Sequence, residues 1–508
     1  MRIFRQWSAA SSGAAAASLS ACGVLLYAAF AALPSSPFQV SLPPGVAPTG
    51  PLVWLSHVAG FDRFSGDRLV AVGIVVTICS LATFFALVIA AWRGDISVRT
   101  VLALVIGYHI VVLFLPLLFS HDVYSYAFYG RIAGVYHANP YLRTPINYPS
   151  DPLFGLAGPK WVDTPAVYGP LFSTLAGAIA RVFRGPMAQV DAYRCLAIIS
   201  SLATVFVTAA TARALWPTRA AFAVAAFGAN PVVLFHAVAS GHNDLLVALS
   251  IAVALALLAR GRELPAVAAL TLGALVKVSG ALPLVLLIVW CVARRPKGER
   301  LRALITRGGI AVAIGLAFAL PYLQRDDPSL GIRELARHRS WLAPSSLLQK
   351  RFADLLTHGT KESEIAFVFW AVLLVAIVTL VVEVARRGSE LSPTANGAVW
   401  GWGLVLLMLL GPVLLPWYVI WAMPLVWLLP AVPRSTLLVS GALVMLAYRS
   451  ADVLGIDTPI QRSWVAHWLL PVGFTVIVGL TLFDLGRRVF LRLPLEYQEE
   501  VPAASGHR

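Results

Sequence analysis

The sequence predicts an all-α polytopic membrane protein of about fourteen transmembrane helices, and two observations predict it. Of the 508 residues, 59% are hydrophobic and only 12% are charged, whereas a soluble globular protein has roughly 25% charged residues. The hydrophobic residues also gather in runs that approach the roughly 20 apolar residues a helix needs to cross a bilayer. We therefore expect residues 1–508 to form a single transmembrane domain.

The net charge of +15, from 39 Lys and Arg against 24 Asp and Glu, has two interpretations. In a soluble protein such an excess suggests binding to nucleic acid. In a membrane protein, basic residues mark the cytoplasmic loops and contact anionic lipid. Because the composition is that of a membrane protein, we expect membrane lipid as a partner and no nucleic acid.

Fourteen apolar segments are the expected helices. They lie at about Gly13–Leu33, Leu69–Trp92, Thr100–Phe119, Ala166–Phe183, Asp191–Leu215, Arg219–Val238, Leu245–Leu258, Pro265–Val292, Ala303–Tyr322, Ile365–Ala385, Thr394–Leu415, Pro416–Leu429, Thr436–Leu454 and Trp464–Leu485. A cleaved signal peptide is an alternative for the first segment, which is nevertheless long for one.

Basic residues between these segments set the expected orientation. Arg93 and Arg99, the dense cluster from Arg294 to Arg307, and Arg487 with Arg488 are predicted to be cytoplasmic. We therefore expect a multi-pass protein of the plasma membrane with both termini in the cytoplasm. Residues 493–508 form a short cytoplasmic tail. The two long polar segments, 120–165 and 323–364, become external loops.

The first external loop carries the most suggestive chemistry. Asp122 follows an apolar segment almost directly, so its carboxylate is expected at the water boundary, beside His121 and Tyr124. A carboxylate in that position can take the proton of an attacking hydroxyl group. The alternative is that Asp122 caps the N-terminus of a juxtamembrane helix.

The motifs of this loop resemble a known family. The stretches H-D-V-Y-S-Y-A-F-Y-G-R (His121–Arg131), A-N-P-Y (Ala138–Tyr141) and D-T-P-A-V-Y-G-P (Asp163–Pro170) are similar to the first external loop of actinobacterial polytopic mannosyltransferases of the GT-C class. Weaker resemblance continues through G-H-N-D at Gly241–Asp244, K-V-S-G at Lys277–Gly280 and L-P-W-Y at Leu415–Tyr418.

The resemblance implies a GT-C-type helical bundle and an active site outside the cytoplasm. It implies a polyprenyl-phosphate sugar as donor, with mannose as the leading sugar, a cell-envelope glycan or glycolipid as acceptor, and inversion at the anomeric carbon. The external aspartate of that class is the general base, and the matching residue here is Asp122. No cofactor is obligatory and no metal ligand is proposed. Because Asp122 has no adjacent carboxylate, the need for a divalent metal stays open.

Further residues of the loops and of the L-P-W-Y motif are candidates for binding the substrate. Aromatic rings can pack on the C–H face of a sugar, amides and carboxylates can bind its hydroxyl groups, and fixed cations can stabilise the charge of a leaving phosphate. These candidates are His121, Tyr124, Tyr126, Arg131, Asn139, Tyr141, Lys160, Asp163, Tyr168, Arg337, Arg339, Trp417 and Tyr418. For the rings the alternative is an interfacial aromatic belt, and for the cations a solvated surface charge.

Asp244 and Lys277 are ionisable residues in or beside apolar segments, which makes them functional candidates. Because successive spans cross the membrane in opposite directions, Asp244 is expected near the cytoplasmic end of its helix, away from Asp122. This placement favours a polar interhelical contact or a helix cap. If the segment after Asn230-Pro231 is instead re-entrant, Asp244 moves towards Asp122.

A polytopic transporter or lipid flippase is the alternative function, because about fourteen spans would also suit one. Transporters concentrate polar groups near the middle of the membrane and show repeat symmetry between their halves. This sequence has its polar groups in two loops and no evident repeat. The sequence therefore favours a membrane glycosyltransferase.

Overall fold

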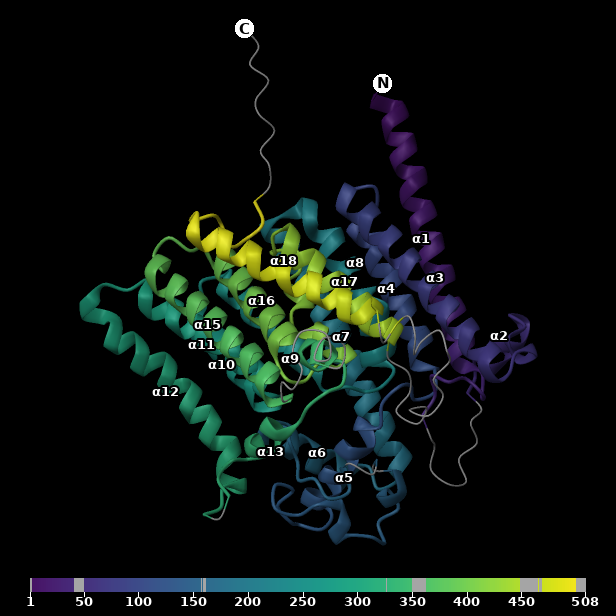
Figure 1. The fold of residues 1–508 in the computed structure, drawn as a ribbon, viewed down its shortest axis with the longest axis horizontal. Coiled ribbons are helices and arrows are strands. Elements are labelled where there is room, and N and C mark those ends of the chain that lie inside the picture. Colours follow the sequence, from purple (N-terminus) through teal and green to yellow (C-terminus); the bar gives the residue numbers. More distant parts are fainter. Residues whose placement is uncertain are drawn as a thin grey trace.

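The computed structural model describes residues 2–40, 50–156, 158, 161–325, 327–349, 362–447, 465 and 468–498. Within these residues every regular element is helical, and the one extended pairing is an isolated bridge between Gln39 and Leu118 (Figure 1). The all-α class predicted from composition is confirmed.

The chain runs through seventeen described α-helices. They are α1 (Arg2–Ala32), α2 (Val53–Val58), α3 (Gly66–Arg93), α4 (Val98–Leu113), α5 (Asp122–Gly134), α6 (Pro170–Val182), α7 (Pro186–Leu215), α8 (Ala220–Gly228), α9 (Asp244–Leu258), α10 (Glu263–Val276), α11 (Ala281–Ala293), α12 (Arg300–Ala319), α13 (Ile332–Arg337), α15 (Glu362–Arg387), α16 (Pro393–Leu410), α17 (Ala431–Ala447) and α18 (Leu470–Phe490).

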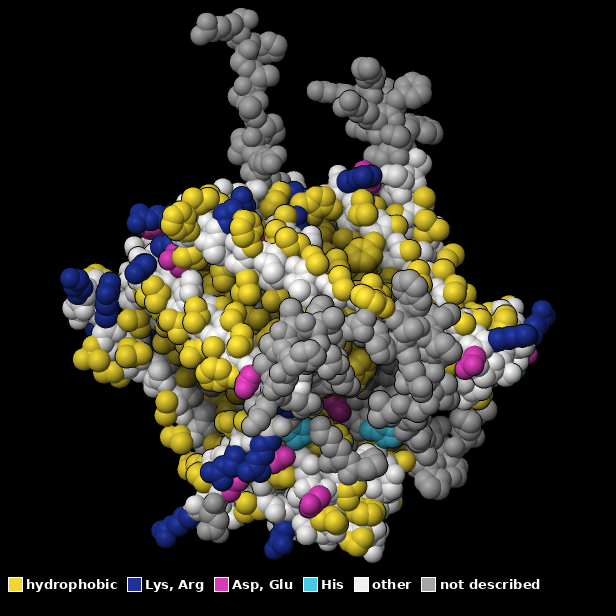
Figure 2. Space-filling model, viewed as in Figure 1, with side chains coloured by type: hydrophobic (Ala, Val, Ile, Leu, Met, Phe, Trp, Pro, Cys, Tyr) yellow, Lys and Arg dark blue, Asp and Glu magenta, His cyan; other side chains and the backbone are white. Residues whose placement is uncertain are grey.

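Seven of the described helices are long and apolar enough to cross a membrane, or eight if one bent pair counts as a single span. Six further apolar helices have 10–17 residues. Apolar side chains cover the helices on the viewed face of the bundle, and many Lys and Arg side chains lie along its edges (Figure 2). A multi-pass membrane protein has this distribution. The count of fourteen spans and the external side of the two loops stay predictions.

The segment predicted as one helix over Arg219–Val238 is broken in the structure. Helix α8 ends at Gly228, and after Asn230-Pro231 the chain continues as a π-helix, η6 (Val232–Val238), at an angle of 41° to the preceding helical segment. Proline has no N–H and cannot continue the α-helical ladder, while Asn230 Oδ1 accepts a hydrogen bond from the Val232 N–H. The chain then turns at Gly241, whose φ of 69° suits glycine, and enters α9.

The single helix predicted over Pro265–Val292 is a hairpin of α10 and α11. Lys277, between them, has extended backbone dihedrals (φ −152°, ψ 135°). Glu263 at the start of α10 pairs with Arg294 and Arg295 just after α11. Both outer ends of the hairpin therefore meet at one end of the bundle, which we call the arginine end. Lys277 lies at the opposite end.

Helices α5 and α6 and the loop between them lie below the bundle in Figure 1. We call this part, residues 122–182, the lobe. Each helix has 13 residues, or about 20 Å of helix, shorter than a hydrocarbon core of roughly 30 Å. The span predicted over Ala166–Phe183 is thus a shorter helix that packs on α5. Glycine allows this packing, because a Cβ at Gly130 would lie 2.5 Å from the Ala176 carbonyl oxygen.

The second polar segment packs against the lobe. The Asn139 side-chain amide donates to the Tyr322 carbonyl at 2.8 Å, and the rings of Trp161 and His338 stack. Ser340 Oγ donates to the Leu414 carbonyl at 2.6 Å. Beyond this contact, the helix predicted over Pro416–Leu429 is replaced by two 3-10 turns, η10 (Pro416–Trp421) and η11 (Met423–Leu425). A proline in each turn explains the irregular backbone.

Candidate active site

Asp122 is the first residue of α5, where the lobe joins the bundle. The cap position is taken by His121, which makes no side-chain capping hydrogen bond, and the Asp122 N–H donates to Ser120 Oγ at 3.1 Å. The Asp122 side chain is 16% exposed, and its Oδ2 lies 3.5 Å from His242 Nδ1. The carboxylate thus faces a histidine from a distant part of the chain, and it does not occupy the cap position.

The segment that leads to Asp122 is held by the bundle. The Arg194 guanidinium on α7 donates to the carbonyls of Val112 and Leu115, which satisfies the end of α4. Ser240 Oγ donates to the Leu118 carbonyl at 2.6 Å. Because these contacts come from α7 and from the turn after η6, the position of Asp122 depends on the broken helix.

Burial raises the pKa of Asp122 to about 6, an effect that the charge of Lys277 opposes and that of Asp244 reinforces. Burial also lowers the pKa of His242 well below its usual value, so the imidazole is neutral. A carboxylate with a pKa near neutrality is well suited to general-base catalysis.

Asp244 and Lys277 join this site. His242 Nδ1 lies 4.0 Å from Asp244 Oδ2, so both carboxylates contact one ring nitrogen. Asp244 Oδ1 accepts hydrogen bonds from Lys277 Nζ at 2.8 Å and from Trp421 Nε1 at 2.6 Å. The interpretation that placed Asp244 away from Asp122 is wrong, because α8 breaks before η6 and the α10–α11 hairpin turns at Lys277. The re-entrant alternative describes this region better.

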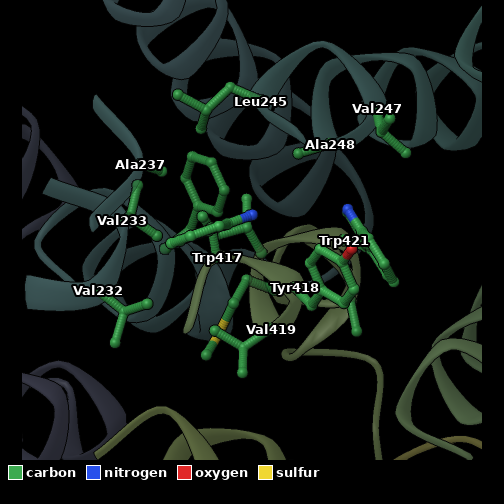
Figure 3. Packing of buried hydrophobic residues seen from close by; sticks show 14 of the residues in the cluster. Val232, Val233, Ala237, Leu245, Val247, Ala248, Trp417, Tyr418, Val419 and Trp421 are labelled. Carbon is green, nitrogen blue, oxygen red and sulfur yellow. The ribbon is translucent and has the colours of Figure 1, made fainter. Parts of the chain in front are cut away.

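An aromatic wall from η10 lines the same place (Figure 3). Trp417 stacks on His242, with ring centroids 3.8 Å apart, and Tyr418 stacks on Trp421 at 4.2 Å. Lys277 Nζ lies 4.4 Å from the centre of the Tyr418 ring. In Figure 3 these rings lie among aliphatic residues of η6 and α9. The two candidates from the L-P-W-Y motif, Trp417 and Tyr418, therefore lie at the site.

Three more candidates lie close by. Tyr126 OH is 3.3 Å from both His242 Nδ1 and Asn243 Oδ1, and the Tyr168 ring meets the Tyr126 ring edge-on at 4.9 Å. His121 Nδ1 lies 3.1 Å from the Leu156 carbonyl oxygen at the rim. On the viewed face, histidine and acidic side chains gather where the lobe meets the apolar bundle (Figure 2).

Other candidates have structural contacts inside the lobe or between the lobe and the residues that follow α12. Arg131 is buried and pairs with Asp151 at 2.7 Å. Asn139 and Tyr141 are used in internal hydrogen bonds, Asn139 to Tyr322 and Tyr141 to the Tyr168 carbonyl. Tyr124 is fully buried in the core. These side chains support the lobe.

The remaining candidates lie at the surface or outside the described residues. Arg337 is 70% exposed and pairs with Glu334 at 3.4 Å. Arg339 and Asp163 are exposed. Lys160 falls outside the described residues. Within the described residues, no three His, Cys, Asp or Glu side chains are grouped to hold a metal ion.

Comparison with known proteins decides the family. A family described as "Alpha-(1->6)-mannopyranosyltransferase, N-terminal domain" matches residues 21–294. The chain belongs to this family. It is also 23% identical, over 423 residues, to alpha-(1->6)-mannopyranosyltransferase A of Mycobacterium tuberculosis (strain ATCC 25618 / H37Rv), an alignment that covers 78% of this chain and 79% of the relative. No solved structure matches the chain.

The region shared with the mannopyranosyltransferase family supplies the charged groups of the site. Asp122, His242, Asp244 and Lys277 all fall within residues 21–294. The aromatic wall comes from beyond that region, at residues 416–421. The candidate site therefore combines charged residues from the region that the family model matches with aromatic residues from a later segment of the chain.

Sequence reasoning did not single out His242 or Trp421, although both have central contacts. The signal available for His242 was its place in G-H-N-D, beside Asp244. Trp421 comes three residues after the L-P-W-Y motif, so its indole follows that motif by one 3-10 turn. More than 100 residues separate His242 from both Asp122 and Trp417, and only the fold brings them together.

Proposed function

We propose that this protein transfers mannose from polyprenyl-phosphate mannose to a hydroxyl group of a cell-envelope glycan or glycolipid, and that Asp122 is the general base. One observation carries the assignment of the base. Asp122 is a partly exposed carboxylate with a raised pKa of about 6, beside a neutral histidine. The family and the mycobacterial relative supply mannose as the sugar and an α-(1→6) bond as the proposed linkage.

The reaction is a single displacement. Asp122 takes the proton of the acceptor hydroxyl group while the oxygen of that hydroxyl group attacks the anomeric carbon of the donor. The bond between that carbon and the phosphate oxygen breaks, and polyprenyl phosphate leaves with the electron pair. Attack from the opposite side inverts the configuration, so a β-linked donor gives an α-mannoside.

The surroundings of the site suit a donor that stays in the membrane. Only 11% of the apolar window along α12, and 17% of that along α15, is buried inside the protein, and lipid is the solvent for such surfaces. Asp122 lies at one end of this bundle. A lipid-linked sugar could thus present its head group there while its tail remains among lipids.

Replacement of Asp122 by Asn tests the proposal. Turnover should fall by about two to four orders of magnitude, the range for loss of a general base, when purified protein in nanodiscs is given synthetic polyprenyl-phosphate mannose and a mannoside acceptor. Asp67→Asn is the matched control, because Asp67 is an exposed residue in the first turn of α3. It should leave turnover unchanged. Near-normal activity of Asp122→Asn, or equal transfer from a nucleotide sugar, would contradict the proposal.

A further inference from the structure

Four ionisable side chains meet at the candidate site, but only two of them reach its surface. The Asp122 side chain is 16% exposed and the Lys277 side chain is 9% exposed, whereas those of His242 and Asp244 are fully buried. A bound substrate can therefore touch Asp122 and Lys277 directly. Asp244 and His242 can act only through their neighbours.

The Lys277 ammonium has hydrogen-bonding capacity left for a ligand. An ammonium group carries three donors, and one of them is used by Asp244 Oδ1 at 2.8 Å. On its other sides, among the described residues, the ammonium faces the ring of Tyr418 at 4.4 Å and that of Trp421 at 5.5 Å. Ring faces attract a cation, and the Tyr418 hydroxyl group also interacts with the ammonium. With Asp244 and Tyr418 as its polar neighbours, the ammonium keeps at least one of its three donors for an anion.

Lys277 also stays charged in this place. Burial, the largest single cause, lowers the pKa of its ammonium, but the charges of Asp244, Tyr418 and Asp122 and the hydrogen bond to Asp244 together outweigh it, so the pKa is raised above its usual value. The result is a fixed, protonated cation at the site surface.

Asp244 is built to position this cation. Its Oδ1 accepts from both Lys277 Nζ and Trp421 Nε1, and no part of its side chain is accessible to an acceptor hydroxyl group. A cation held before the reaction begins stabilises developing negative charge without reorganising. Asp244 and Trp421 thus supply that preorganisation.

We propose that Lys277 binds the phosphate of the polyprenyl-phosphate donor and that Asp244 and Trp421 position its ammonium. This inference rests on the proposed function. The leaving phosphate gains negative charge as the bond to the sugar breaks, and Lys277 is the buried cation placed to receive it. Asp122 belongs to the same cluster, because His242 Nδ1 lies 3.5 Å from Asp122 Oδ2 and 4.0 Å from Asp244 Oδ2, and Asp244 Oδ1 accepts from Lys277 Nζ. The base and the phosphate-binding cation can therefore contact one bound donor.

Binding of polyprenyl monophosphate, the product of the proposed reaction, tests the assignment without requiring turnover. Lys277→Met should raise its Kd by about 10- to 100-fold, the range for losing a charge-assisted hydrogen bond, and Lys277→Arg should recover part of that loss. Lys297→Met, at an exposed position after α11, is the control and should bind like the wild type. Asp122→Asn should also bind normally while losing turnover.

The results separate two kinds of failure. Equal, tight binding by the wild type and Lys277→Met would overturn the role of Lys277 and leave the proposed function standing. Absence of binding by the wild type, Lys297→Met and Asp122→Asn alike would overturn the donor class, and the phosphate assignment with it.

The positioning role of Asp244 has its own readout. Asp244→Asn should raise the Kd for polyprenyl monophosphate, and adding it to Lys277→Met should weaken binding no further, because the two residues act as one unit. Trp421→Phe keeps an aromatic ring at this position and removes the N–H donor to Asp244, so it should weaken binding by about 3- to 10-fold. This test does not depend on whether Asp244→Asn folds. Normal binding by Trp421→Phe, or by Asp244→Asn with turnover lost, would overturn the positioning role.

Discussion

The two ends of the bundle each hold a carboxylate among cations, and the two arrangements differ. At the arginine end, Glu263 pairs with Arg294 at 3.5 Å, with Arg295 at 3.0 Å and with Arg307. At the site end, Asp244 pairs with one lysine and one indole, and its Oδ2 has no hydrogen-bond donor among the described residues.

The difference lies in how the hydrogen-bonding groups are used. Glu263 is shared by three guanidinium groups that hold α10, the residues after α11, and α12 together. At the site, Lys277 keeps donors that Asp244 does not use, and a second carboxylate, Asp122, stands close by. A carboxylate that is shared by three segments of the chain stabilises the fold, whereas a cation beside a partly exposed second carboxylate is suited to bind a substrate.

The comparison predicts that the two ends lie on opposite sides of the membrane. In a variant without the four native cysteines, Ser150→Cys in the lobe should react completely with an impermeant thiol reagent in intact cells. Gly298→Cys, at an exposed position between α11 and α12, should react only after lysis, because basic loops stay in the cytoplasm.

Permeabilised cells are the control, since both cysteines should then react. Reaction of Gly298→Cys in intact cells, or of Ser150→Cys only after lysis, would reverse the orientation. Equal labelling of both in intact cells would contradict the opposite placement of the two ends.

The second prediction concerns pH. Burial raises the pKa of Asp122 to about 6, and the base works only when deprotonated. Activity should therefore be high at pH 7 and fall about tenfold per pH unit below pH 6, to about one hundredth at pH 4. The measurement is kcat/KM against pH, with thermal unfolding at each pH to show that the protein remains folded.

The Asp122→Asn variant provides the internal control. Its residual activity should lose the step near pH 6, because that residue no longer titrates. A step of the same size and position in this variant would assign the titration to another group. A flat profile in the wild type would contradict the raised pKa as a feature of catalysis.

The sequence predicted the fold class and part of the site for sound physical reasons. Long apolar runs with few charges form helices in lipid, since every backbone polar group must be satisfied within the segment. Asp122 follows such a run, and Trp417 and Tyr418 follow another. The position of a candidate residue could thus be predicted where that residue directly follows an apolar segment.

The pairing of distant segments could not be predicted in this way. The prediction treats each apolar run as one straight span, so it missed the turn at Lys277, although Pro283 in the first turn of α11 is a signal for a helix start. Asn230-Pro231 did mark a break, and it suggested the re-entrant alternative. Similarly, nothing local shows that Arg131 pairs with Asp151 inside the lobe. Both errors concern which residues meet in space, which single-sequence patterns specify weakly.

The last prediction has the smallest expected effect on activity. Glu263→Gln removes the charge that three arginines share at the arginine end. The Glu263 side chain is 11% exposed, but those of Arg294 and Arg295 are 38% and 32% exposed, so water compensates part of the loss. We expect the free energy of unfolding to fall by about 1–3 kcal/mol, below the range for a fully buried pair. Thermal unfolding in one detergent, compared with Asp67→Asn, measures this change.

Turnover of Glu263→Gln below the unfolding temperature should stay within about twofold of the wild type, because no group that faces the substrate has changed. A tenfold loss of turnover in folded Glu263→Gln would show that the arginine end takes part in catalysis, and the contrast between the two ends would fail.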